Sequence, residues 1–292
     1  MILALFWTTV FMFGASIGSF LNVCVLRWPA GESVVRPRSR CPACTRQIRW
    51  YENIPLASWV ALRATCAGCG HPISIRYPAV ELLVGLGWLA CGLTFGPGFT
   101  ALRVAVFGTI LFGIAITDLE HYLIPDGFTV FGLAWALLTA FLGVMVPEVS
   151  PFAGPLDAIV GACVGAGAIA IAGWLGEVAL KREAMGFGDV TLMAFAGAAL
   201  GPTRSLLTVF VGAAIGAVIF LAIVIPVTRA RRSRAPADIP PSGGAAVTGN
   251  DDVRAPGEPP LVPFGVFLAP AALITLLWGD AMVTWYLRLL MT

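Results

Sequence analysis

Long apolar stretches follow one another through most of this 292-residue sequence. A helix that crosses a bilayer needs about 20 predominantly apolar residues. Charged residues make up only 12% of the chain, too little polar material to cover a soluble core. We therefore predict an all-α polytopic membrane protein with about eight transmembrane helices. The expected spans are residues 1–26, 79–96, 99–117, 125–146, 155–179, 188–201, 205–228 and 262–280.

The span at 188–201 is shorter than the others and rich in Gly and Ala. A stretch of this length is short for a full bilayer crossing. Small residues, however, allow helices to approach closely inside a membrane protein. The composition therefore predicts a short or buried helix at this point of the chain.

Charge is unevenly distributed around the first span. No charged side chain precedes Arg27, so the opening stretch lacks the basic start of a cleavable secretory signal and is expected to remain as a membrane helix. Between Arg27 and Arg76 there are eight arginines and only two acids, Glu32 and Glu52. Basic loops stay in the cytoplasm, which predicts a periplasmic N-terminus and cytoplasmic turns near 118–125 and 181–187.

The chain divides into five predicted parts. The first transmembrane helix occupies 1–27, a cytoplasmic cysteine domain 28–77, a group of membrane helices 78–228, a linker 229–261, and the last transmembrane helix with the C-terminus 262–292. Pro, Gly, Ser and Ala dominate the linker, which predicts a flexible tether. Its basic beginning is expected to meet anionic headgroups, and regulatory binding is an alternative.

The cysteine domain contains Cys41-Pro-Ala-Cys44 and Cys66-Ala-Gly-Cys69. Two such pairs can supply the four thiolates of a tetrahedral zinc site, and metal would stabilise a domain too small to bury much core. A redox or disulfide pair is the alternative, although a cytoplasmic location disfavours it. Because four cysteines close the site, His71 is not included as a ligand. The sequence therefore predicts Zn²⁺ bound by Cys41, Cys44, Cys66 and Cys69.

Two aspartates stand at the membrane rim. Asp118 ends the third span and Asp189 opens the sixth, both on the predicted cytoplasmic side. Ionisable groups at membrane depth are costly and typical of functional sites, and two converging carboxyl groups can divide the roles of acid and base. Gly186 and Gly188 permit a close approach of backbone to substrate. Helix capping is the simpler interpretation, and an ion-coupled transporter or a zinc-containing scaffold is a further alternative.

Both halves of the chain resemble type IV prepilin peptidases, a group of G-x-G-D membrane aspartyl proteases. The resemblance rests on Asp118 with the following Ile124-Pro125-Asp126, and on Gly186-Phe187-Gly188-Asp189. In the amino-terminal half it rests on Gly18-Ser19-Phe20-Leu21-Asn22-Val23, Arg27 and Pro29, the four cysteines, Asn53-Ile54-Pro55, Ser58-Trp59 and Ile75-Arg76-Tyr77-Pro78-Ala79-Val80-Glu81. The linker at 229–261 departs from the family pattern.

The resemblance implies an enzyme of the bacterial inner membrane with two activities. Such enzymes cut the short basic leader from prepilins and pseudopilins after a glycine, and then methylate the new amino terminus with S-adenosyl-L-methionine. The resemblance assigns Asp118 and Asp189 as the catalytic dyad. Prepilin substrates and the lipid bilayer are the expected partners, and no nucleic-acid partner is expected.

Methyl transfer rests on the resemblance, because no glycine-rich motif for the cofactor is visible in the sequence. Glu81 is a candidate for positioning the pilin amine, and an interfacial ion pair with Arg76 is the alternative. Glu120 and His121 flank Asp118, where they either tune it, contact the leader, or are simply solvated.

Overall fold

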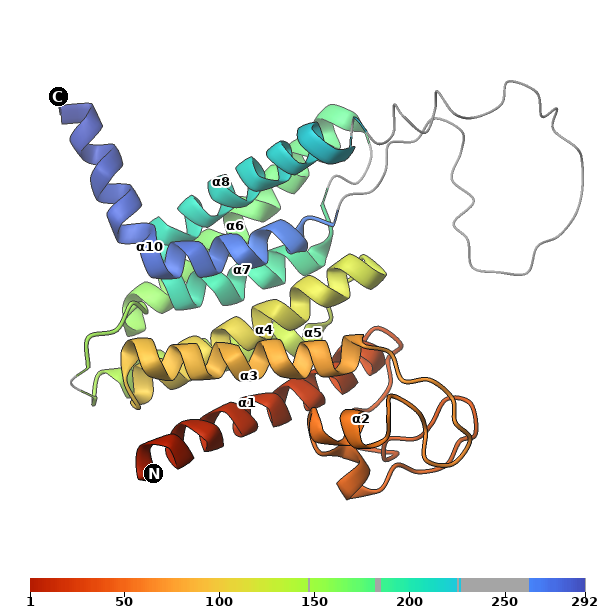
Figure 1. Cartoon of the computed structure of the whole chain (residues 1–292). Coiled ribbons are helices and arrows are strands. Elements are labelled where there is room, and N and C mark those ends of the chain that lie inside the picture. The colour runs from red at the N-terminus through yellow and green to blue at the C-terminus, as the bar shows by residue number, and fades with distance from the viewer. Residues whose placement is uncertain (147, 182–184, 225, 227–262, 292) are drawn as a thin grey trace, which may run out of the picture.

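The computed structural model describes residues 1–146, 148–181, 185–224, 226 and 263–291 (Figure 1). Within these ranges the regular secondary structure is helical. The described residues also form two isolated β-bridges, Arg40 with Gln47 and Thr65 with Pro72. The predicted linker at 229–261 lies outside the described residues. The helices are α1 (Ile2–Arg27), η1 (Trp50–Asn53), α2 (Ala57–Ala61), α3 (Arg76–Phe95), α4 (Phe99–His121), α5 (Asp126–Gly143), α6 (Pro155–Leu180), α7 (Phe187–Leu200), α8 (Pro202–Ile219), η2 (Phe220–Val224) and α10 (Gly265–Met291).

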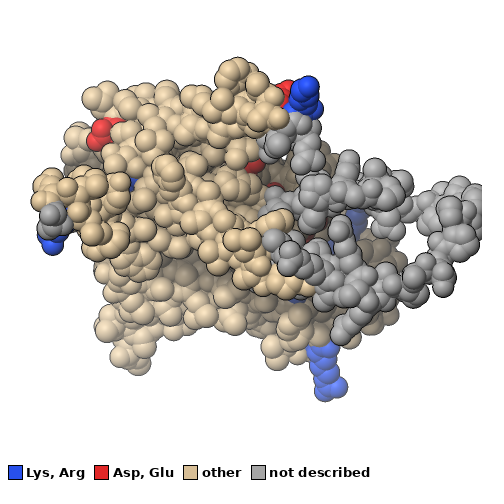
Figure 2. All heavy atoms as spheres, turned by 90° about the horizontal axis from the view of Figure 1, so that it is seen from above, with Lys and Arg blue, Asp and Glu red and all other residues tan. Residues whose placement is uncertain are grey.

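The predicted membrane architecture is confirmed. Seven helices in the described part of the chain are long and apolar enough to cross a membrane, and α7 is a shorter apolar helix of 14 residues. Figure 2 shows a face of the molecule made almost entirely of uncharged side chains, with few charged groups visible. The protein is therefore an all-α multi-pass membrane protein.

Some helix ends differ from the sequence prediction. Helix α4 continues to His121 rather than ending at 117, because the chain leaves the helix only at Tyr122, which adopts a left-handed conformation with φ of 53°. Helix α10 continues to Met291 instead of residue 280. Asp280 suggests an end in the sequence, but the apolar residues that follow it extend the helix.

Helix α7 is short because it lies inside the protein. It packs against α5, α6, α8 and α10, and the side chains of Leu192, Met193 and Phe195 are fully buried. Glycines make the contact with α6 possible, since a Cβ atom on Gly161 or Gly197 would collide with the backbone of the other helix. This close backbone contact is the arrangement that small residues favour in membrane proteins.

Helices α1 and α3 pack together in a similar way. A Cβ atom on Gly18 would lie 2.8 Å from the Cα atom of Glu81. Close by, the side-chain amide of Asn22 donates a hydrogen bond to the carbonyl oxygen of Tyr77 at 3.1 Å. The glycine of the Gly18-Ser19-Phe20 motif thus brings the ends of two helices, and the cysteine segment between them, into contact.

One end of the helix bundle gathers the chemically interesting elements. Figure 1 shows the cysteine segment, the end of α4, the start of α7 and the start of α10 at the same end of the molecule. The two aspartates and the four cysteines therefore lie toward one end, as the orientation derived from the arginines requires.

Candidate active site

Asp118 lies in the last turn of α4 and is 5% exposed. The backbone N–H of Val266, at the start of α10, donates a hydrogen bond to Oδ2 of Asp118 at 3.0 Å. A Cβ atom on Gly265 would lie 2.8 Å from the same oxygen, so the contact depends on a residue without a side chain. The partly positive N-terminus of α10 favours the charged form of this carboxyl group.

Asp189 lies in the first turn of α7, three residues after Gly186, which precedes the helix. The side chain is 9% exposed, and its Oδ1 atom is buried without a hydrogen-bond partner among the described residues. An unpaired carboxyl oxygen in a buried place is costly in a folded protein. Such a group is suited to accept or donate a proton when a substrate enters.

The two carboxyl groups are close enough for the charge of Asp118 to act on Asp189. The side chain of Ile124 packs against both Gly188, next to Asp189, and Gly265, next to Asp118. A Cβ atom on either glycine would lie 2.8 Å from it. The turn after α4 is therefore held between the starts of α7 and α10. The structure brings together the two aspartates that the sequence singled out, and adds a third element to the site.

The capping interpretation explains the aspartates only in part. Oδ2 of Asp118 does accept a hydrogen bond from the backbone N–H of Val266 at the start of α10. This bond joins two helices that are far apart in the chain, so it is not a cap of the helix that holds Asp118. The backbone N–H of Gly186 acts on the carboxyl group of Asp189 at the start of its own helix, whereas Asp126 is exposed at the start of α5. Capping therefore leaves the buried Oδ1 atom of Asp189 unexplained, since it has no hydrogen-bond partner among the described residues.

The charged residues near Asp118 form their own ion pair. Nε of Arg76 lies 2.8 Å from Glu120, and His121 is 3.9 Å from the same glutamate. Arg76 therefore pairs with Glu120 rather than with Glu81. Glu81 is buried at the α1–α3 contact, where its Oε2 atom accepts a hydrogen bond from the backbone N–H of Leu56 at 2.8 Å. Leu56 has a φ of 60°, so Glu81 fixes a strained turn of the cysteine segment.

The four predicted zinc ligands converge. The sulfur atoms of Cys41, Cys44, Cys66 and Cys69 all lie within 4.8 Å of one another, and those of Cys41 and Cys69 are 3.8 Å apart. Zinc at about 2.3 Å from four tetrahedrally placed sulfurs sets them about 3.8 Å apart, so the cluster fits the ion. His71 is not in the cluster, and its backbone carbonyl accepts from the N–H of Cys66 instead.

Each cysteine pair sits in the same kind of tight turn. The N–H of Thr45 donates to the carbonyl of Cys41, and that of Gly70 to the carbonyl of Cys66, both at 2.9 Å. Backbone N–H groups of Gly68 and Cys69 lower the pKa of Cys66 to about 6, and similar groups of Cys44 and Ala43 lower that of Cys41. Backbone donors thus favour the thiolate forms that bind a metal ion.

Known protein families match most of the chain in sequence. Residues 12–95 match the Bacterial Peptidase A24 N-terminal domain, and residues 105–221 match the Type IV leader peptidase family. A Prepilin leader peptidase/N-methyltransferase from Myxococcus xanthus is 41% identical over 87% of this chain and 74% of its own length. Proteins of the same name from Aeromonas hydrophila and Pseudomonas aeruginosa are 33% and 31% identical, over 97% and 95% of this chain and 94% and 92% of their own lengths.

The chain belongs to the type IV leader peptidase family. The resemblance found in its sequence motifs is thereby confirmed. Membership of a peptidase family does not favour an ion-coupled transporter or a scaffold without catalysis. No solved structure matches this chain.

Sequence reasoning missed the contact of α10 with Asp118. Gly265 and Val266 lie more than 140 residues after Asp118, with a hydrogen bond spanning 148 positions. A usable signal existed in the sequence, since Pro263-Phe264-Gly265 stands at the start of the last apolar stretch. A glycine at such a place often marks a close approach of backbone to another group.

Proposed function

We propose that this protein removes the short basic leader from prepilins and pseudopilins by cutting after a glycine, and then methylates the new amino terminus. The printed names of its relatives join these two activities, and the chain aligns with nearly the full length of several of them. The observation that carries the cleavage proposal is the pair of buried, interacting carboxyl groups of Asp118 and Asp189.

The two aspartates have surroundings that suit different roles. Asp118 receives the Val266 N–H and the positive end of α10, so it is the carboxylate that accepts a proton from the attacking water. Asp189, whose Oδ1 atom has no described partner, holds the shared proton and donates it to the carbonyl oxygen of the scissile peptide. Water adds to the carbonyl carbon, and a proton then passes to the leaving nitrogen as the bond breaks.

Cleavage by purified protein in detergent, measured as leader release from a prepilin, tests these roles. Asp118→Asn and Asp189→Asn should each lower the rate about 100- to 10,000-fold, because each removes a proton-transferring group. Asp126→Asn is the matched control, since Asp126 is exposed on a neighbouring helix start, and it should cleave at the wild-type rate. Leader release at the wild-type rate by either of the first two variants would refute the protease assignment.

Three further residues are proposed to position the substrate. Gly186 and Gly188 flank the start of α7, where the lack of side chains keeps the approach to Asp189 open. Glu81 holds the turn at Leu56 and, in this proposal, places the cysteine segment so that the pilin amine can reach it. Burial of Glu81 and its bond across the α1–α3 contact support a positioning role.

Zinc is proposed to bind the four-cysteine cluster as a structural ion. One equivalent of zinc per chain is expected from metal analysis of the wild type. A Cys44→Ser, Cys69→Ser double variant should lose it and lose methyl transfer, while retaining most of its cleavage. Cys163→Ser, which changes an exposed cysteine outside the cluster, is the matched control. A wild-type protein without zinc, together with intact methyl transfer in the double variant, would contradict the proposal.

The N-terminus is proposed to face the periplasm of the bacterial inner membrane, with both sites in the cytoplasm. The arginine-rich segment from 27 to 76 supports this orientation. Labelling of single cysteines in intact cells with a membrane-impermeant reagent tests it. A cysteine placed at Val149 should react and one at Arg63 should not, and the reverse pattern would show the opposite orientation.

S-adenosyl-L-methionine is proposed as the second cofactor, and it supplies the methyl group when bound. The N-methyltransferase activity in the names of the relatives supports it. The part this chain plays is to hold the cofactor beside the new amino terminus.

A further inference from the structure

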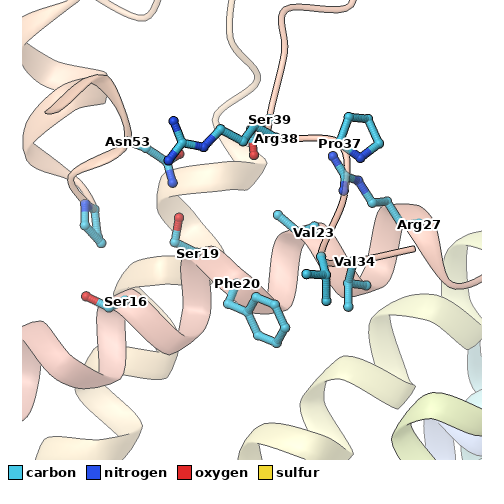
Figure 3. Close-up of a pocket in the computed structure, with 12 residues that line it drawn as sticks. Ser16, Ser19, Phe20, Val23, Arg27, Val34, Pro37, Arg38, Ser39 and Asn53 are labelled. Atoms are coloured by element: carbon cyan, nitrogen blue, oxygen red, sulfur yellow. The ribbon is translucent and has the colours of Figure 1, made fainter. Parts of the chain in front are cut away.

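A pocket of about 340 Å³ lies between the C-terminal half of α1 and the cysteine segment that follows it (Figure 3). Phe20 and Arg27 line it from α1, and Arg38 and Asn53 line it from the cysteine segment. Phe20 and Arg38 are exposed, so the pocket is open to its surroundings. No residue of α4, α7 or α10 lines it, and the pocket is therefore separate from the two aspartates.

The pocket carries positive charge without a neutralising side chain. Arg27 and Arg38 both line it, and no acidic side chain does. Neither arginine forms an ion pair with another described residue. The two acids of this part of the chain lie elsewhere, since Glu52 pairs with Arg46 and Glu32 does not line the pocket. Two guanidinium groups without a counter-charge suit an anionic ligand.

The pocket extends across the border between the apolar and the polar parts of the chain. Helix α1 is a candidate membrane span, and Arg27 at its end is the first charged residue of the sequence. Ser16, which also lines the pocket, precedes Arg27 by eleven positions, or about 16 Å along a helix. One part of the pocket therefore lies within the apolar span, and the other part lies at the level where lipid headgroups are found.

The lining residues of α1 share one face of the helix. Ser16, Phe20, Val23 and Arg27 follow the spacing of a helical stripe, and none of them is among the residues that α1 buries against the bundle. Phe20 is 53% exposed. An apolar stripe of a membrane helix that no described helix covers is accessible to acyl chains, and here the stripe leads directly to Arg27.

We propose that this pocket binds one anionic phospholipid from the leaflet beside the cysteine segment. Arg27 and Arg38 hold the phosphate, because guanidinium groups form paired, charge-assisted hydrogen bonds with phosphate oxygens. Ser19 and Asn53 offer hydrogen bonds to the remaining oxygens of the headgroup, and an acyl chain lies along Phe20. Soluble phosphate esters share the phosphate chemistry but would leave the apolar stripe uncovered. The inference depends on neither of the two proposed activities.

The charge of the lining also selects among phospholipids. A zwitterionic lipid carries an ammonium group next to its phosphate, and that cation would meet two arginines and no carboxylate in this pocket. Phosphatidylglycerol carries hydroxyl groups in the same place, so only its attraction to the arginines remains. The pocket is therefore expected to prefer anionic over zwitterionic lipids.

A lipid in this pocket would join the cysteine segment to the membrane. Arg27 donates a hydrogen bond to the carbonyl oxygen of Ser33 at 2.9 Å, so its guanidinium group is held where the cysteine segment begins. On the other side of the pocket, the carbonyl of Ser39 accepts from the N–H of Ile48 at 2.9 Å. This bond connects the lining to the turn of the first cysteine pair, so a lipid bound by both arginines holds that turn beside α1.

Native mass spectrometry of the full-length protein in detergent tests the site, with titrations of phosphatidylglycerol and of phosphatidylcholine with the same acyl chains. The wild type should bind one phosphatidylglycerol roughly tenfold more tightly than phosphatidylcholine. Arg38→Ala should weaken phosphatidylglycerol binding roughly fivefold or more, since each arginine near the headgroups contributes attraction of that size. Arg36→Ala is the matched control, because Arg36 is an exposed arginine two positions away that does not line the pocket. It should bind like the wild type.

Glycerol 3-phosphate separates a lipid from a soluble phosphate, because it has the phosphate but no acyl chain. It should bind far more weakly than phosphatidylglycerol, and Phe20→Ala should weaken the lipid alone. Tight binding of glycerol 3-phosphate, with phosphatidylglycerol bound equally by the wild type and Phe20→Ala, would make the occupant a soluble phosphate and overturn the lipid proposal. Equal affinity of the wild type for the two lipids, or equal lipid binding by the Arg36 and Arg38 variants, would overturn the site itself.

Discussion

Asp118 and Asp189 carry the same carboxyl group in different surroundings. Both stand at helix ends and both are buried, yet one receives a backbone N–H and the other has an oxygen without a described partner. The proposed mechanism gives these two residues unequal roles, as in other sites where two carboxyl groups divide acid and base chemistry. The difference comes from Gly265 and Val266, at the start of a helix that follows in the chain by more than 140 residues.

Gly265→Val should impair cleavage selectively. Its added side chain begins 2.8 Å from Oδ2 of Asp118 and from Ile124, so the carboxyl group must move, and displacement of a catalytic group by about 1 Å costs roughly 100-fold in rate. Methylation of a pilin without its leader should persist. Gly108→Val in α4 is the control, since its nearest neighbour is 3.9 Å away. Wild-type cleavage by the Gly265 variant would show that α10 does not position Asp118.

The proposed catalytic pair and the proposed zinc ligands could be singled out from sequence because each is a chemically rare residue in an informative place. A carboxyl group beside an apolar span and a repeated Cys-x-x-Cys pair each carry a physical meaning without any structure. The contact from Val266 uses only a backbone N–H, which every residue except proline has. A hydrogen bond of this kind depends on the tertiary arrangement and leaves almost no trace in the sequence.

For helix α7, too, the sequence pattern predicts one property and the packing determines another. Its length and its Gly and Ala content predict a short, closely packed helix, and the structure confirms this. Which helix it packs against does not follow from composition. The backbone contact between Gly161 and Gly197 identifies α6 as the partner, so these glycines serve the placement of Asp189 from a distance.

Gly161→Leu should lower the thermal stability of the detergent-solubilised protein. Overpacking costs about 1–3 kcal/mol or more, and here the obstacle is backbone that cannot rotate away. Gly167→Leu makes the same change on the same helix where no atom lies within 4 Å of the added Cβ, and it should leave the melting temperature nearly unchanged. Equal melting temperatures for the two variants would contradict the close α6–α7 contact.

The contact of Glu148 with the start of α4 predicts that the stability of the protein depends on pH. Its carboxylate accepts from the backbone N–H groups of Thr100 and Phe99, which lower its pKa below the ordinary value. The pKa of Glu148 is therefore lower in the folded than in the unfolded protein. The contribution of Glu148 to the free energy of unfolding is fully present above the unfolded-state pKa, and it is lost as pH falls through the folded-state pKa.

Thermal unfolding of the wild type and Glu148→Gln across this acidic range measures the effect. The wild type should be the more stable at neutral pH, and the difference should shrink as pH falls below the usual carboxyl range. Glu177→Gln, on an exposed helical glutamate, is the control and should show no such trend. A difference between wild type and Glu148→Gln that is constant with pH would contradict the capping contact.

At the scale of the whole molecule, the end of α4, the start of α7 and the cysteine segment lie at one end of the bundle (Figure 1). The membrane explains this arrangement, since charged groups are expensive elsewhere in such a protein. Arginine placement predicts the shared end from sequence, because it fixes the direction of the first helix. The pocket of about 340 Å³ beside α1, lined by Ser19, Arg38 and Asn53 among others, could not be predicted in this way, since folding alone brings its lining together (Figure 3).

The central claim is that one chain holds two separate sites, an aspartate dyad that cuts and a cysteine domain that supports methyl transfer. Mass spectrometry of pilin products tests it most directly, with each variant given an intact prepilin and, separately, a pilin already lacking its leader. Asp189→Asn should leave the prepilin uncut but methylate the shortened pilin, and the Cys44→Ser, Cys69→Ser double variant should cut the prepilin but leave its product unmethylated. Loss of both activities in a folded Asp189→Asn protein, or of cleavage in a double variant whose membrane helices remain folded, would contradict the account.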